Sequence, residues 1–211
     1  MAKKSGYHHG DLRRALLAEA VEVLSEGGAR SLSMRGLARR LGVSHAAPAH
    51  HFGTKAALLA AIAADSFDQL AAQMEAAQAE VADPVARFSA TGAAYIRYAC
   101  ANPARFRVMF QPELTAGDNP ELREQQRRAF RVLMENARAS APAELELDVD
   151  AVALAAWTMV HGVATLWLDG PLRQVGERRR FDSVEEVAER VLGMLQRLLR
   201  GALQAARQGE G

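Results

Sequence analysis

Residues 33–59 read SMRGLARRLGVSHAAPAHHFGTKAALL, and this stretch decides how the chain folds. Ser33 can cap a first helix with its hydroxyl, and Gly42 supplies the left-handed residue at which helices often end. Val43 packs the turn, and Ser44 can cap a second helix by accepting from its free backbone N–H groups. The pattern predicts a helix-turn-helix, a motif whose second helix is inserted into the major groove of DNA.

The stretch resembles the DNA-binding domain of the TetR family of bacterial transcription regulators. The resemblance rests on Gly42-Val43-Ser44 and on the run HFGTKAALL at residues 51–59. It implies a DNA-binding domain of three helices over residues 10–70, in which the first helix packs under the helix-turn-helix pair.

One position departs from the family pattern. The family usually places Leu-Tyr where this chain has Pro48-Ala49. The usual tyrosine contacts DNA, so that contact is absent here. Because Pro48 is the fourth residue after the Ser44 cap, its missing N–H removes the first bond of the helix, and we expect a looser first turn.

The positions of the side chains in the motif suggest their roles. Phosphate contacts position a protein on DNA, and base contacts specify the sequence. We expect His45 and Ala46 to meet base edges and His50 and Lys55 to contact the backbone, while Arg35 can reach a guanine or a phosphate. The complete set of expected DNA-binding residues is Ser33, Arg35, Ser44, His45, Ala46, His50, His51, Thr54 and Lys55.

Charge is unevenly distributed along the 211 residues, whose net charge is only +1. Residues 1–55 hold nine Lys/Arg against four Asp/Glu, together with five of the six histidines. The remainder is acidic overall, with 17 Lys/Arg against 21 Asp/Glu. A basic end is the electrostatic footprint of a polyanion-binding protein, although a solvated basic face would give the same counts.

Cysteine usage and hydropathy indicate the compartment. The single cysteine, Cys100, cannot form an intrachain disulfide, which favours a reducing cytoplasm. We expect no membrane partner, because no apolar run reaches membrane-spanning length and the start of the chain lacks the apolar core of a signal peptide.

Abundant alanine and leucine with few β-branched residues predict an all-α fold of about nine helices. The family resemblance implies a C-terminal helical bundle, over residues 83–206, that binds a ligand and dimerises. Outside the motif, helices are expected over residues 11–26, 55–78, 83–100, 103–110, 120–141, 148–168 and 183–206. Gly27 and Gly28 should end the first of these, and Ser183 with Glu186 should form a capping box at the last.

The helix expected over residues 148–168 is apolar nearly all round, so it must be covered on several sides. The resemblance implies a homodimer, because TetR-family subunits pair through a four-helix bundle of C-terminal helices. Two heads on a twofold axis would reach successive major grooves about 34–36 Å apart, which predicts a palindromic operator. The alternative is that the last helices only close the core of a monomer.

Large apolar and polarisable side chains on four helices favour a ligand pocket. The expected lining residues are Phe106, Met109, Phe110, Phe130, Met134, Trp157, His161 and Trp167. Each of them alone is better explained by a place in the core. Trp157-x-x-x-His161-Gly162 resembles the Trp-His-Gly signature of one class of TetR C-terminal domain, and its spacing places indole and imidazole on one helix face. His161 can donate to a ligand or be a satisfied core histidine.

These features predict a ligand-responsive, dimeric transcription regulator, expected to be a repressor that a small, largely apolar effector releases from its double-stranded DNA operator. A transcription activator of the same fold and an architectural DNA-binding protein without ligand stay open as alternatives. We expect no enzyme, no cofactor and no metal site. The pairs His8-His9 and His50-His51 point apart on a helix, no carboxylate or cysteine completes a ligand set, and no nucleophile elbow or phosphate loop is present.

Overall fold

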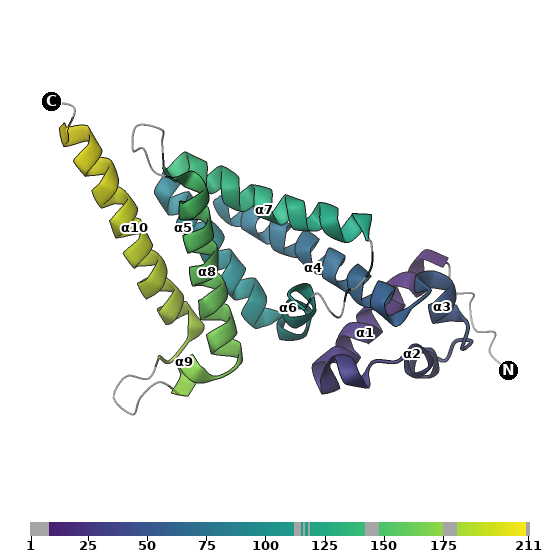
Figure 1. The fold of residues 1–211 in the computed structure, drawn as a ribbon. Helices are drawn as coiled ribbons and strands as arrows, with labels where there is room; N and C mark the ends of the chain where they lie inside the picture. Colours follow the sequence, from purple (N-terminus) through teal and green to yellow (C-terminus); the bar gives the residue numbers. More distant parts are fainter. Residues whose placement is uncertain are drawn as a thin grey trace. The chain divides into compact units, whose positions relative to one another are not determined.

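A computed structural model describes residues 9–111, 115, 117, 119–141, 148–174 and 181–209. The described residues form ten helices, which confirms the all-α fold (Figure 1). The helices are α1 (His9–Ser31), α2 (Met34–Leu41), α3 (Ala47–Phe52), α4 (Lys55–Gln78), α5 (Pro84–Ala101), α6 (Pro103–Met109), α7 (Pro120–Ser140), α8 (Val149–Leu168), α9 (Pro171–Gln174) and α10 (Val184–Gly209). About nine were expected, and the short α9 falls in a stretch without an expected helix.

Contacts within the chain divide it into two compact units, which we call the head and the body. The head comprises residues 1–66 and 103–124, and the body comprises residues 67–102 and 125–211. The head therefore holds α1, α2, α3, α6 and the first half of α4, and the body holds α5, α8, α9 and α10. Both α4 and α7 run from one unit into the other.

The cap and turn signals of the first motif helix are confirmed. Ser33 precedes α2, and its Oγ accepts from the backbone N of Gly36 at 3.1 Å. Gly42 follows α2 in the left-handed conformation, with φ 64° and ψ 31°. The backbone N of Val43 donates to the carbonyl oxygen of Ala38 at 3.0 Å, which closes the turn.

The start of the second motif helix differs from the prediction. The N-cap of α3 is Ala46, so Ser44 lies too early to cap the helix, and its carbonyl oxygen accepts from the N of Ala47 at 3.0 Å instead. Pro48 accounts for the shift, because proline is tolerated where a helix requires no N–H. As the second residue of α3, Pro48 removes no helical bond. The premise that Pro48 removes the first bond of the helix was therefore wrong.

The glycine pair after the first helix bends that helix instead of ending it. α1 continues to Ser31, with a kink at Gly28, where φ is 69° and ψ is −172°. A side chain at this position would be strained, which explains the glycine. Ser31 Oγ donates to the carbonyl oxygen of Gly28 at 2.8 Å and so bonds the backbone beside the kink.

The head is built around α1 and the first half of α4. Leu16 of α1 and Leu58 of α4 are fully buried. α6 packs against α1, and it is tied to α4 by Arg105. The guanidinium of Arg105 donates to Asp65 Oδ2 at 2.6 Å and to Ser66 Oγ at 3.3 Å. Sequence order alone would have assigned α6 to the body.

In the body, α5 packs closely against both α8 and α10 (Figure 1). Gly92 of α5 lies where the three helices meet. A Cβ at this position would be 2.9 Å from Leu192 Cδ2 and 3.2 Å from Val160 Cγ1. The absent side chain therefore allows the three helices to approach one another.

α8 corrects the expectation that no apolar run reaches membrane-spanning length. It has 20 residues, and an 18-residue window of it has a mean hydropathy of 1.6, so by length and composition alone it could cross a membrane. Core helices of water-soluble proteins pass the same test. Thr158 and His161 interrupt the run, but its mean hydropathy is still high enough for a membrane-spanning helix. Only 28% of the window is buried within the described residues.

Gly92→Ala is expected to lower the melting temperature relative to Gly193→Ala in α10. Both substitutions gain about 1 kcal/mol of helix propensity, so that term cancels. At Gly193 a Cβ would meet only Arg197 Nη1, at 3.5 Å, whereas at Gly92 it crowds buried side chains. Overpacking of this kind costs about 1–3 kcal/mol. Thermal unfolding followed by circular dichroism measures the difference, and equal melting temperatures would show that the three helices can separate without cost.

Candidate functional site

α3 buries one face and exposes the other. Pro48 and Phe52 lie one helical turn apart and are buried, while His45 and His50 are exposed. The guanidinium carbon of Arg13, on α1, lies 5.3 Å from the centroid of the Phe52 ring, a cation–π contact. These contacts fix the direction in which the exposed side chains point.

The predicted DNA-binding residues all lie in the head. Seven of them are exposed: Ser33, Arg35, Ser44, His45, Ala46, His50 and Thr54. The other two, His51 and Lys55, are half-buried. The His51 ring centroid lies 5.6 Å from that of His50 and 6.4 Å from that of Phe52, its two neighbours in α3.

The same part of the head contains no carboxylate in its sequence. Residues 27–64 include five Lys/Arg and three histidines but no Asp or Glu. Arg40 is engaged with the preceding acids of α1, pairing with Glu19 and, at 2.8 Å, with Glu26. The hydrogen bond with Glu26 raises the pKa of Arg40, and the same bond lowers the pKa of Glu26. Arg40 therefore ties α2 to α1.

Lys55 makes a contact that the sequence did not indicate. Its Nζ donates to the carbonyl oxygen of Ala29 at 2.6 Å and so links the start of α4 to the end of α1. Thr54 caps α4, because its Oγ1 accepts from the N of Ala57 at 3.1 Å. An ammonium group has three donors, so this bond leaves Lys55 able to meet a phosphate.

Three predicted ligand residues belong to the head. Phe106 and Met109 of α6 are buried, and Phe110 is half-buried. The ring centroids of Phe106 and Phe110 lie 5.0 Å apart. The other five predicted ligand residues belong to the body.

In the body, Trp157 and His161 of α8 meet Tyr95 of α5. Tyr95 Oη lies 2.8 Å from His161 Nδ1, and the ring centroids of Trp157 and His161 are 5.7 Å apart. Burial raises the pKa of Tyr95, partly opposed by a hydrogen bond with Trp157, and burial lowers the pKa of His161. At neutral pH the phenol is thus protonated and the imidazole neutral, so the hydroxyl can donate to Nδ1. Sequence reasoning missed Tyr95 as a site residue, because it lies 66 residues from His161.

The remaining predicted ligand residues have different environments. Met134 of α7 is buried, Trp167 near the end of α8 is half-buried, and Phe130 of α7 is 58% exposed. Phe130 lies one turn before Met134 on the same face of α7. Met134 belongs to an apolar cluster with Ala153 and Ala156 of α8.

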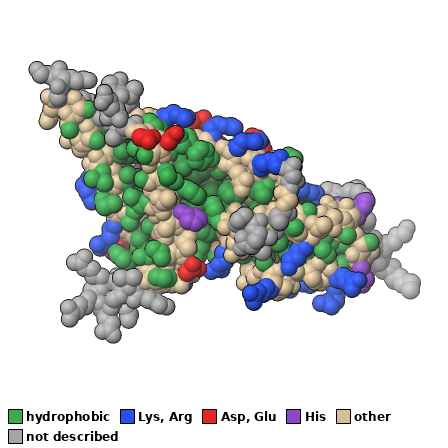
Figure 2. Space-filling model, in the orientation of Figure 1, with side chains coloured by type: hydrophobic (Ala, Val, Ile, Leu, Met, Phe, Trp, Pro, Cys, Tyr) green, Lys and Arg blue, Asp and Glu red, His purple; other side chains and the backbone are tan. Residues whose placement is uncertain are grey.

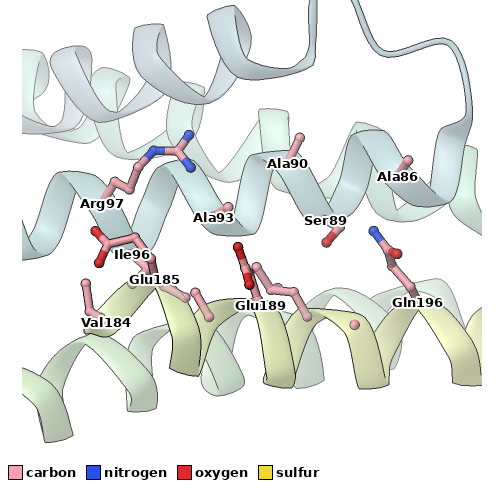
Figure 3. A pocket seen from close by; sticks show the side chains of 13 residues that line it. Ala86, Ser89, Ala90, Ala93, Ile96, Arg97, Val184, Glu185, Glu189 and Gln196 are labelled. Carbon is pink, nitrogen blue, oxygen red and sulfur yellow. The ribbon is translucent and has the colours of Figure 1, made fainter. Parts of the chain in front are cut away.

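A separate groove of about 460 Å³ lies between α5 and α10 (Figure 3). Small residues such as Ala93 and Gly193 line it, together with Arg97 from α5 and with Glu185 and Glu189 from α10. None of the predicted ligand residues lines this groove. Among the described residues, no group of three His, Cys, Asp or Glu could hold a metal ion.

Stability is expected to fall as the pH drops below about 6.5, and His161 should cause part of this loss. Because burial lowers the pKa of His161 in the folded protein, the unfolded chain binds more protons in this range. The contribution is fully present above the ordinary imidazole pKa and is lost as pH falls toward the folded value. Urea unfolding of the wild type and of His161→Gln at pH 7.5 and 5.5 tests this. The variant should lose less stability between the two conditions, and equal losses would contradict the assignment.

Two protein-family models match the chain. The model described as bacterial regulatory proteins, tetR family, matches residues 16–62, which include α2 and α3. The model described as tetracyclin repressor-like, C-terminal domain, matches residues 88–195. No curated protein matches the chain.

Solved structures extend the similarity over most of the chain. A protein of unknown function from Rhodococcus sp. RHA1 is 34% identical with a TM-score of 0.75, covering 92% of this chain and 98% of that one. The TetR family transcriptional regulator PfmR from Thermus thermophilus is 28% identical with a TM-score of 0.63, covering 86% and 97%. AibR, solved with isovaleryl coenzyme A and operator DNA, shares the fold at 20% identity with a TM-score of 0.65, covering 86% and 96%. The chain therefore belongs to the TetR family of bacterial regulatory proteins, and it is a DNA-binding transcription regulator and not an enzyme.

Proposed function

We propose that this regulator is a homodimeric cytoplasmic repressor, released from a palindromic operator by a small, largely apolar effector. The anchored α3, with its polar face exposed, is the observation that carries the proposal, because a rigid exposed helix is what enters a major groove. A transcription activator of the same fold is the alternative. An architectural DNA-binding protein without an effector is a third reading, which predicts uniform coating of any duplex.

The proposed DNA-contacting side chains of the head divide into those that meet base edges and those that contact phosphates. His45 and Ala46, just before α3, are assigned to base edges, and Arg35 to a guanine or a phosphate. His50 and Lys55 are assigned to phosphates. Lys55 lies at the start of α4, where unpaired backbone N–H groups and the helix dipole also favour an anion.

An uncovered apolar face supports the dimer. Exposed residues on α8 include Ala151, Leu154, Ala155, Thr158 and Leu166, and those on α10 include Met194, Leu198, Gly201 and Ala205. Their spacings of three and four residues place each set along one helix face. Figure 2 shows hydrophobic side chains at the surface over these helices. Extended exposed apolar patches mark interaction surfaces, and a second copy would cover this one.

Phe130 supports an effector site in the body. It is 58% exposed, although Met134 on the same face of α7 is buried in one cluster with Ala153 and Ala156 of α8. A large exposed aromatic side chain one helical turn from a residue of an apolar cluster can contact an apolar molecule. The Trp157-His161-Gly162 resemblance to the Trp-His-Gly class, with Tyr95 bonded to His161, adds a polar group. AibR, of the same fold, binds isovaleryl coenzyme A and operator DNA.

The switch is a shift between two dimer states. The effector favours the state whose heads are wrongly spaced for the operator, and DNA affinity falls by the effector's preference for that state. Coupling of about 1–3 kcal/mol is enough for a measurable response. α4 is the connecting element, because it belongs to the head and to the body.

Selection of bound duplexes from random DNA, with and without candidate effectors, tests this function. We expect one palindromic site. Lys55→Ala should then weaken binding to every duplex and reduce the slope of log Kd against log salt by about 0.9, because one phosphate contact is lost. Lys55→Arg keeps the charge and serves as the control, and thermal unfolding reports any loss of the bond to Ala29. A changed sequence preference at unchanged salt dependence would refute the assignment of Lys55.

Leu198→Glu is expected to convert the dimer to a monomer, because it places a carboxylate in the proposed interface. Phe130→Glu is the matched control: the two side chains are 62% and 58% exposed, but Phe130 lies outside that face. Sedimentation velocity measures both, and circular dichroism verifies that the helices persist. A Leu198→Glu protein that sediments as the wild type would exclude this part of α10 from the interface.

A further inference from the structure

Histidines are concentrated on the exposed surface of the head. His45 precedes α3, and His50 and His51 lie in its last turn. His45 and His50 are exposed, and His51 is half-buried. Figure 2 shows histidine side chains at this surface. Imidazole is the only side chain whose ordinary titration falls near neutral pH, so the charge of this surface depends on pH.

The surroundings of these imidazoles are cationic. α2, which packs against α3, carries Arg35, Arg39 and Arg40. α1 contributes Arg13 over the Phe52 ring, where it also pairs with Glu121 at 4.0 Å, and α4 begins with Lys55. The carboxylates of α1 that reach α2, Glu19 and Glu26, are bonded to Arg40.

Residues 27–64 themselves contain no Asp or Glu. A DNA phosphate beside the histidines would favour their protonation, since an opposite charge stabilises the charged form.

We propose that this head binds DNA together with protons, taken up by His50 and His45 as they come against the duplex. The proposal rests on the proposed DNA-binding function. A neutral imidazole has one N–H donor, whereas an imidazolium has two and carries a charge. Protonation lets His50 make a charge-assisted bond to a phosphate oxygen, which is stronger than a neutral one. His45, at the base edges, lies in the same negative potential of the duplex.

Two consequences follow for the affinity. DNA binding tightens as the pH falls through the imidazole range, by about threefold to tenfold for each imidazole that takes up a proton. The salt dependence also becomes steeper at the lower pH. Each further phosphate neutralised adds about 0.9 to the slope of log Kd against log salt.

The experiment measures Kd for a duplex selected from random DNA at pH 7. Fluorescence anisotropy is recorded at pH 6.5, 7.5 and 8.5 and at several salt concentrations, within the range in which the circular dichroism signal is constant. The wild type is compared with His50→Gln, which stays neutral, and with His50→Lys, which stays charged. His45→Gln tests the second imidazole. Arg138→Gln, an exposed charge removal on α7, controls for net charge.

The wild type should bind more tightly and with a steeper salt slope at pH 6.5 than at pH 8.5. Both effects should shrink in His50→Gln and His45→Gln, and they should persist in Arg138→Gln. His50→Lys should bind at pH 8.5 nearly as well as the wild type at pH 6.5. A pH-independent Kd, or a pH dependence unchanged in both glutamine variants, overturns the proposal and leaves the regulator function intact. Failure to select any duplex would instead refute the proposed function.

Discussion

The direction of α3 depends on the two side chains that it buries. A helix of six residues is too short to persist alone in water, so its packing must hold it in place. Phe52 lies in the core under the guanidinium of Arg13, and Pro48 lies one turn earlier on the same buried side. Without these two buried side chains, His45 and His50 would have no fixed orientation. Side chains can recognise a DNA groove only when the helix holds them in fixed positions relative to one another. Pro48 can take this place because its missing N–H falls where the helix needs none.

Charge in the head is arranged around this helix. Residues 27–64 lack carboxylates, and two acids of α1, Glu19 and Glu26, are bonded to Arg40. Further along α4, Asp65 pairs with Arg105 of α6. Each of these partly exposed pairs contributes only about 0–1 kcal/mol of stability. Their larger effect is on the field, because an acid paired with an arginine of another helix contributes less negative potential in the head.

Local signals were predictable from the sequence, and long-range ones were not. The Ser33 cap, the left-handed Gly42 and the start of α4 after Thr54 depend on neighbours within four residues, and the structure has all of them. The bend at Gly28 and the start of α3 depend on how the chain continues to pack, so local rules misplaced both ends. Tyr95 was missed as a site residue because its contact also depends on packing. It joins α5 to His161 of α8, and no spacing in the sequence indicates it.

The position of α8 connects the core of the body with the proposed assembly. Gly92 allows α5 to lie close to Val160 of α8 and Leu192 of α10, so α8 is well covered on that one side. Its opposite side, including Leu154 and Leu166, remains exposed. Burying apolar surface yields about 25 cal/mol per Å², so this uncovered side favours association. In the proposed dimer one helix therefore closes the body and also meets the second copy, so a rotation of α8 on effector binding would also alter how the two copies meet.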